Sequence, residues 1–129
     1  MIVLDTSVLV EALDVSNQLG LQVRKLLFQG EDLVLPSPVI FEWLCGPRSA
    51  DDLSWQEGLF PAEFAIPFGI EEARVAAELY RAVSRVRGRK FDLAIAACAI
   101  VREAPLWTLN LADFRDIPGL RLYSPDSLA

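Results

Sequence analysis

Short apolar runs alternate with segments of helical periodicity, and this alternation constrains the fold more than any other feature of the sequence. Apolar runs of strand length occupy residues 2–4, 33–35, 64–68, 106–108 and 120–123. The segments between them are predicted helices. Parallel strands need such crossover connections, which cover both faces of their sheet. The sequence therefore predicts an α/β fold, a three-layer sandwich with a mainly parallel central sheet.

The intervening segments carry recognisable helix signals. Ser37 and Pro38 are typical of the cap and the first position of a helix, and Gly30 is typical of a C-terminal cap. The segment after Asp92 is apolar nearly all round, which predicts a central, buried helix. We expect helices at residues 6–13, 17–29, 47–58 and 71–87, and helices starting at 37 and near 92.

Length and composition indicate one domain over residues 1–129. The chain has 129 residues, of which 53% are hydrophobic, and a domain of this size buries about two-thirds of its unfolded surface. Cys45 and Cys98 lie in apolar stretches without a CxxC pair, so we expect two reduced core residues and a cytoplasmic protein. The start of the chain lacks a basic region, which argues against a signal peptide. No apolar run approaches the roughly 18 residues that span a bilayer.

Acidic residues stand where predicted strands and helices meet. Asp5 directly follows the first strand, Asp92 begins the buried helix, and Asp113 lies shortly after Thr108. Glu42 lies on the helix that leaves the second strand. Ligands of parallel α/β sheets bind outside the carboxyl ends of the strands, so we expect the four carboxylates at one edge. Converging carboxylates attract a hard divalent cation.

Each acid also has a purely structural interpretation. Asp5 and Asp92 could cap helices, where Asp stabilises by about 1 kcal/mol, and Asp113 could close an Asx-turn. Glu42 fits this view less well, because an unpaired carboxylate inside an apolar helical turn is costly. The placement of four acids from independent segments at one edge favours a shared site.

Charge and residue usage restrict the chemistry. The chain lacks histidine, which excludes imidazole zinc sites and Ser-His-Asp triads, so catalysis needs carboxylates and metal. The net charge of −6 opposes nucleic-acid binding through bulk electrostatics. Five of the twelve basic residues nevertheless lie within residues 81–90, directly upstream of Asp92. This basic strip could bind nucleic-acid phosphates beside the acids. Alternatively, it could be a solvated helix end whose positive charges complement the helix dipole.

Four fragments resemble the PIN-domain family, and more narrowly the VapC-type toxins of toxin–antitoxin pairs. The start MIVLDTSVLVEAL matches the family's D-T-S/N element, and the helix with Glu42 follows at the usual distance. FDLAIAACA matches D-x-x-I-A-A-x-A, and TLNLADF matches T-x-N-x-x-D-F. The resemblance covers essentially the whole chain and implies a PIN-like α/β fold.

The resemblance implies a Mg²⁺- or Mn²⁺-dependent endoribonuclease, with one or two ions, whose toxicity a cognate small antitoxin restrains. The implied catalytic carboxylates are Asp5, Glu42, Asp92 and Asp113. The implied metal ligands are the three aspartates among them. The implied supporting residues are Thr6, Ser7, Thr108 and Asn110. Asn110 is acidic in some members of the family, so either it or Asp113 could be the fourth contributor.

Substrate and partner surfaces are also expected. The candidate RNA-binding residues are Arg85, Arg87, Arg89 and Lys90. Their RGRK stretch departs from the proline and small residues that are common there in the family. A homodimer is expected through the apolar helical region from Glu42 to Trp55 and its neighbour Phe41, because this region carries more apolar area than one sheet face needs.

Other functions also suit an acidic α/β domain of this length. A phosphoacceptor receiver module needs paired acids after the first strand and a late lysine, whereas this chain has only Lys25 and Lys90. A housekeeping PIN nuclease, or a PIN-like binding protein without catalysis, is the closer alternative. Trp43, Phe91 or Phe114 could stack an unpaired base, but core packing is the simpler role for these aromatic residues.

Overall fold

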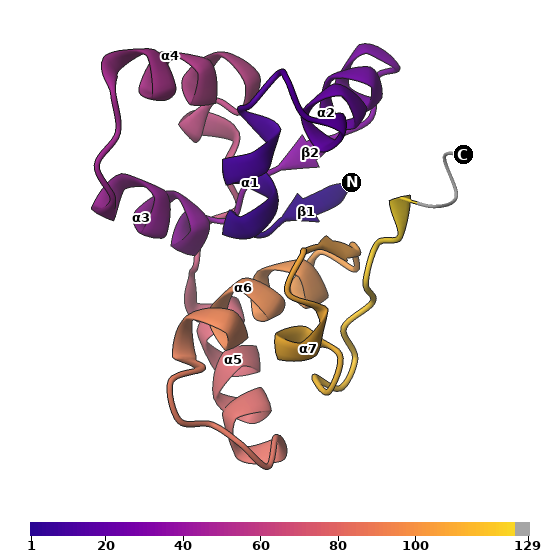
Figure 1. The fold of residues 1–129 in the computed structure, drawn as a ribbon. Helices are drawn as coiled ribbons and strands as arrows, with labels where there is room; N and C mark the ends of the chain where they lie inside the picture. The colour runs from indigo at the N-terminus through magenta and orange to yellow at the C-terminus, as the bar shows by residue number, and fades with distance from the viewer. Residues whose placement is uncertain (126–129) are drawn as a thin grey trace.

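A three-stranded parallel sheet forms the centre of the computed structural model, which describes residues 1–125 (Figure 1). Strand β1 (Ile2–Leu4) lies between β2 (Leu33–Val34) and β3 (Leu106–Trp107). Both neighbours pair with β1 in parallel, and all three strands are buried along their full length. This topology confirms the predicted α/β fold with a mainly parallel central sheet.

Helices flank the sheet and connect its strands (Figure 1). Their bounds are α1 (Thr6–Ala12), α2 (Gln18–Phe28), α3 (Ser37–Cys45), α4 (Ala50–Leu59), α5 (Ile70–Ala82), α6 (Lys90–Val101) and α7 (Leu111–Phe114), with a 3₁₀ turn η1 (Ala62–Phe64). As its apolar sequence predicts, α6 is largely buried, and it packs against α3, α5 and α7. Asp92 therefore lies in the first turn of a central helix. No helix within residues 1–125 has the length and apolar character needed to cross a membrane.

Two of the predicted strands are reduced to single bridges at the edges of the sheet. Ile66 bridges Pro36, and Leu122 bridges Leu106, both in parallel orientation. The prediction of full strands in these two segments is therefore wrong. Pro36 and Pro67 cannot donate ladder hydrogen bonds at the first edge. At the second edge, β3 offers only two residues as partners.

Helix α5 ends at Ala82, before the predicted end at Arg87. The next residue, Val83, has an extended backbone with φ −80° and ψ 145°. Val83 and Val86 are β-branched, and Gly88 has a positive φ of 75°, so the local sequence disfavours a longer helix. Residues 83–89 form a loop between α5 and α6, the α5–α6 loop, and this loop carries most of the basic strip.

The two cysteines lie in different environments. Cys98 is fully buried in α6, and burial raises the pKa of its thiol to about 12. Cys45 is exposed in the last turn of α3, so its prediction as a core residue is wrong. Trp43 lies on the buried face of that helix. Two positions further on, the helix has rotated by about 200°, which places Cys45 on the opposite side.

Candidate functional site

Asp5 lies at the carboxyl edge of the sheet, directly after β1. Its side chain is buried (4% exposed), and its Oδ2 accepts hydrogen bonds from Ser7 Oγ at 2.9 Å and Thr108 Oγ1 at 2.7 Å. Thr108 directly follows β3, so the two parallel strands bring donor and acceptor to the same edge. No donor within residues 1–125 contacts Oδ1 of Asp5, which leaves this oxygen available to another ligand.

The capping interpretation of the two aspartates is wrong. Asp5 occupies the N-cap position of α1, but its side chain makes no capping hydrogen bond. The N-cap residue of α6 is Arg89, so Asp92 lies inside the first turn. Ser7 Oγ instead accepts a hydrogen bond from the backbone N–H of Leu109 at 3.0 Å. Hydroxyl groups therefore tie the start of α1 to the loop after β3, with the Asp5 carboxylate between them.

Glu42 lies on α3 and is exposed. Its Oε1 accepts a hydrogen bond of 2.6 Å from Thr6 Oγ1, at the start of α1. The apolar surroundings expected for Glu42 are not found, because its side chain reaches solvent and has a hydrogen-bond partner. The hydrogen bond from Thr6, together with the packing of α1 against α3, holds the carboxylate at the start of α1, the helix that Asp5 precedes.

Burial and neighbouring charges both act on the carboxyl of Asp92. Burial, followed by the charges of Asp5, Asp113 and Glu42, raises the pKa of this carboxyl from 3.8 to about 6, whereas Arg89 lowers it. A helix N-terminus favours the ionised form of a carboxylate. The raised pKa therefore means that burial and neighbouring negative charge outweigh the helix dipole. The negative charges of the other three predicted carboxylates therefore all act on Asp92.

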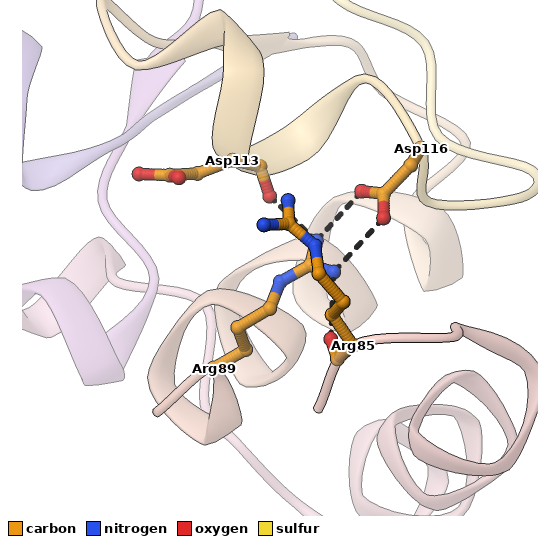
Figure 2. A network of polar contacts seen from close by, with 4 residues as sticks. All are labelled: Arg85, Arg89, Asp113 and Asp116. Atoms are coloured by element: carbon orange, nitrogen blue, oxygen red, sulfur yellow. Dashed lines mark hydrogen bonds and ion pairs between the residues drawn. The ribbon is translucent and has the colours of Figure 1, made fainter. Parts of the chain in front are cut away.

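Asp113 lies in α7, and its carboxylate points away from Asp116 (Figure 2). Within residues 1–125 this carboxylate accepts no hydrogen bond, so an Asx-turn does not explain its position. Asn110 is exposed, and its backbone N–H donates to Thr108 Oγ1 at 3.0 Å while its carbonyl accepts from the N–H of Asp113 at 3.0 Å. Asp113 also acts on the pKa of Asp92, which makes it the better candidate for the fourth contributor.

A pocket of about 610 Å³ brings the α5–α6 loop together with Asp92 and Asp113. The other lining residues are Ser84, Arg85, Val86, Arg87, Gly88 and Arg89. Arg85 and Arg87 are exposed, so their guanidinium groups are accessible to an anionic ligand. Basic and acidic side chains therefore share one pocket.

Arg89 differs from its basic neighbours, because its side chain is only 10% exposed. It donates two hydrogen bonds to Asp116, at 2.7 and 2.9 Å, and one of 2.7 Å to the carbonyl of Asp113 (Figure 2). These donors already serve acceptors inside the protein, which disfavours the prediction that Arg89 contacts RNA. Lys90 is exposed, and its Nζ lies 5.9 Å from the centre of the Tyr80 ring.

The three candidate stacking residues lie in different places. Trp43 and Phe114 are buried, at 2% and 1% exposure, and belong to the core. Phe91 is 40% exposed and packs against Phe41, with ring centres 5.4 Å apart. This pair lines an apolar groove of about 350 Å³ beside Lys90. Of the three, only Phe91 is accessible to a base.

The donor set of the site suits a hard cation. Within residues 1–125 no three acidic or thiol side chains are already arranged to hold a metal ion. All candidate ligands are nevertheless carboxylate oxygens, which Mg²⁺ and Mn²⁺ prefer. Mg²⁺ also binds through one or two carboxylates and keeps several waters, so a closed protein cage is not required. Asp5 Oδ1 and the carboxylates of Asp92 and Asp113 fit such a site.

Sequence reasoning missed one residue of this region. Asp116 binds Arg89, which lies 27 positions earlier in the chain. In the sequence it precedes Ile117, Pro118 and Gly119, where an acidic residue suits a turn. Nothing local marks it as the partner of a buried arginine.

Comparison with known proteins places this geometry in a family context. The model of the family described as PIN domain matches residues 2–120. A ribonuclease VapC from Rickettsia bellii is 46% identical over 61 residues. That match covers 44% of this chain and 44% of the relative, so the chain spans less than half of the relative's length.

Solved structures share the fold at lower sequence identity. VapBC2 from Rickettsia felis, bound to a DNA fragment from its promoter, matches with a TM-score of 0.74 and 23% identity, over 95% of this chain and 98% of that chain. FitAcB from Neisseria gonorrhoeae matches with a TM-score of 0.73 and 21% identity, over 97% and 98%. Since the family model spans almost the entire chain and the fold agrees, this chain belongs to the PIN domain family.

Proposed function

We propose that this chain is a divalent-metal-dependent endoribonuclease that acts as the toxin of a toxin–antitoxin pair. The observation that carries the proposal is geometric: Asp5 directly follows β1 at the carboxyl edge of the sheet, and Asp92 and Asp113 line one pocket. The charges of Asp5, Asp113 and Glu42 contribute, after burial, to the raised pKa of Asp92. Carboxylates that repel one another destabilise a fold. Such a cluster at the ligand-binding edge of a parallel sheet is a functional-site candidate, and its negative charge suits a cation.

The proposed metal ligands are Asp5, Asp92 and Asp113. Bound Mg²⁺ or Mn²⁺ supplies charge neutralisation on the phosphoryl oxygens and an activated water. Ser7 and Thr108 orient Asp5 by binding Oδ2, so that Oδ1 stays open.

Glu42 has a different role in the proposal. Thr6 occupies its Oε1 and holds the side chain at the solvent-exposed rim of the site. The second oxygen then faces water, where it can orient a water molecule or accept its proton. Thr6 and Glu42 therefore act as a pair, one positioning the other.

RNA is the proposed substrate, and the α5–α6 loop supplies its phosphate contacts. Arg85 and Arg87 are exposed and line the same pocket as Asp92 and Asp113. Lys90 extends the positive charge into the neighbouring groove. Phosphate contacts of this kind fix the position of the backbone and carry no sequence information. We therefore expect binding that weakens steeply with salt.

The relatives support a toxin. One sequence relative is named ribonuclease VapC, and the matching VapBC2 structure is bound to promoter DNA. We expect a small antitoxin whose C-terminal segment lies along α3 beside Glu42 and directs an arginine at the carboxylates. Trp43 is buried, so the exposed apolar surface for this contact comes from Phe41 and Leu44, which are 58% and 54% exposed.

A homodimer through the neighbouring helical region is part of the proposal. Leu53 and Trp55 on α4 are 38% and 53% exposed, so α4 also presents apolar side chains to solvent. Burial of such side chains is the usual driving force for association. Size-exclusion chromatography with light scattering tests this, and a monomer at micromolar concentration contradicts it.

RNA cleavage with matched variants tests the catalytic proposal. Asp5→Asn and Asp92→Asn each remove one charge while keeping the side-chain shape, so both should abolish Mn²⁺-dependent cleavage and retain the circular dichroism spectrum. Asp51→Asn removes an exposed carboxylate from the first turn of α4 and should leave cleavage unchanged. Full activity of either site variant contradicts the assignment.

Expression in bacteria tests the toxin role separately. The wild-type chain alone should arrest growth, and co-expression of the product encoded beside its gene should restore growth. A chain that is harmless alone but cleaves RNA in vitro indicates a housekeeping PIN nuclease. A chain that cleaves no RNA but binds a partner indicates a binding protein without catalysis.

A further inference from the structure

Arg89 connects the two elements that carry Asp92 and Asp113. Its backbone caps the start of α6, three residues before Asp92. Its guanidinium lies against the α7 region, where Nη2 donates to the carbonyl of Asp113 at 2.7 Å. Nη1 also donates to the carbonyl of Arg85 at 2.9 Å, and both groups bind Asp116. One side chain therefore joins α6, the α5–α6 loop and α7 (Figure 2).

The contact to Asp113 goes to its backbone and not to its carboxylate. In Figure 2 the Asp113 carboxylate points away from Arg89 and Asp116, and Asp113 lines the same pocket as Asp92. Arg89 thus holds the residue through its backbone carbonyl and makes no direct hydrogen bond to its carboxylate within residues 1–125, although the two charges attract at longer range. The carboxylate stays available to a ligand while the backbone that carries it is anchored.

Asp116 makes this anchoring compatible with a cation site. An unpaired guanidinium beside Asp92 would oppose the binding of a positive ion. Asp116 forms a two-bonded ion pair with Arg89, at 2.7 and 2.9 Å, so the pair has no net charge. Planar guanidinium can bind a carboxylate in this way and still donate to two carbonyls, whereas the compact ammonium of lysine cannot match the same four acceptors.

We propose that Arg89 is a positioning residue that sets the separation of the Asp92 and Asp113 carboxylates by tying the start of α6 to the backbone of α7. The inference rests on the proposed function, in which these carboxylates hold the metal ion. Groups that orient metal ligands from outside typically contribute 10- to 100-fold to metal affinity. Arg89 therefore acts on the site through other residues and touches neither metal nor RNA.

Isothermal titration with Mn²⁺ alone, without RNA, tests this role. Arg89→Lys keeps the charge but loses the planar fork, so it should weaken Mn²⁺ binding roughly tenfold. In cleavage assays at saturating Mn²⁺, kcat should fall more than KM rises. Arg74→Lys is the matched control, because Arg74 is exposed near the start of α5 and does not line the pocket. It should bind Mn²⁺ as the wild type does.

Asp116→Asn is a second variant that keeps the arginine. Asp116 is 39% exposed, so its replacement should leave the fold intact while it removes the negative partner of Arg89. A smaller loss of Mn²⁺ affinity than in Arg89→Lys is expected. If Asp116→Asn or a folded Arg89→Lys variant binds Mn²⁺ as tightly as the wild type, the positioning role is refuted. If the wild type itself binds no Mn²⁺, the proposed function fails, and the role of Arg89 fails with it.

Discussion

Replacement of Asp92 by Asn should stabilise the metal-free protein at neutral pH. The carboxyl of Asp92 has a pKa of about 6 in the folded chain, against 3.8 for an unperturbed aspartate. A raised pKa means that the fold disfavours the ionised form. The folded state therefore loses stability as the pH rises from 3.8 to about 6. Above this pH range the ionised carboxylate lowers the free energy of unfolding by its full amount, and below this range it has no effect.

The size of the penalty follows from the two pKa values. At about 1.4 kcal/mol per pH unit, the difference corresponds to an upper value of about 3 kcal/mol. Asp92 is only partly buried, so solvent screening reduces the penalty to about 1 to 2 kcal/mol. In a domain of this size 1 kcal/mol shifts the melting temperature by roughly 4 °C. The Asp92→Asn variant should therefore melt roughly 4 to 8 °C above the wild type.

Thermal denaturation in EDTA, followed by circular dichroism, measures this difference. Asp51→Asn, the exposed control on α4, should not raise the melting temperature. The gain from Asp92→Asn should shrink as the pH approaches 3.8, since protonation then removes the same charge. In Mn²⁺ the wild type should melt above the Asp92→Asn variant, because the ion stabilises only a protein that binds it. A melting temperature of Asp92→Asn equal to or below the wild type, in EDTA near neutral pH, refutes the repulsion argument.

Three further outcomes are expected. Thr108→Val should slow cleavage and lower the free energy of unfolding by about 1.5 to 3 kcal/mol, because it removes the buried hydrogen bond to the Asp5 carboxylate. Urea titration measures this, and unchanged stability contradicts it. In the native protein a thiol reagent should modify Cys45, which is exposed, and reach the buried Cys98 only after denaturation; equal native reactivity speaks against the described burial. Arg87→Ala should raise KM for RNA and reduce the slope of the logarithm of the binding constant against the logarithm of salt concentration by about one. An unaltered KM contradicts the assignment of Arg87 to the RNA-binding surface.

Features that depend on local pattern could be predicted from the sequence. The position of Asp5 follows from the strand before it, because a residue after a buried parallel strand must lie at the carboxyl edge of the sheet. The central position of α6 follows from its apolar sequence, since such a surface has to be buried on all sides. The placement of Thr108 follows from β3 in the same way. These inferences need no knowledge of distant contacts.

Features that depend on a distant partner were decided by the tertiary structure. Glu42 lies in an apolar turn of the sequence, yet it is exposed, because α3 turns the opposite face, with Val39 and Trp43, into the core and packs on α1 and α6. The basic strip is the clearest case. Arg87 and Arg89 are the same residue type, two positions apart, and both fit a phosphate-binding loop. Arg87 is exposed, whereas Arg89 is buried. The reason is that Asp116, 27 residues later in the chain, supplies the carboxylate that a buried guanidinium requires.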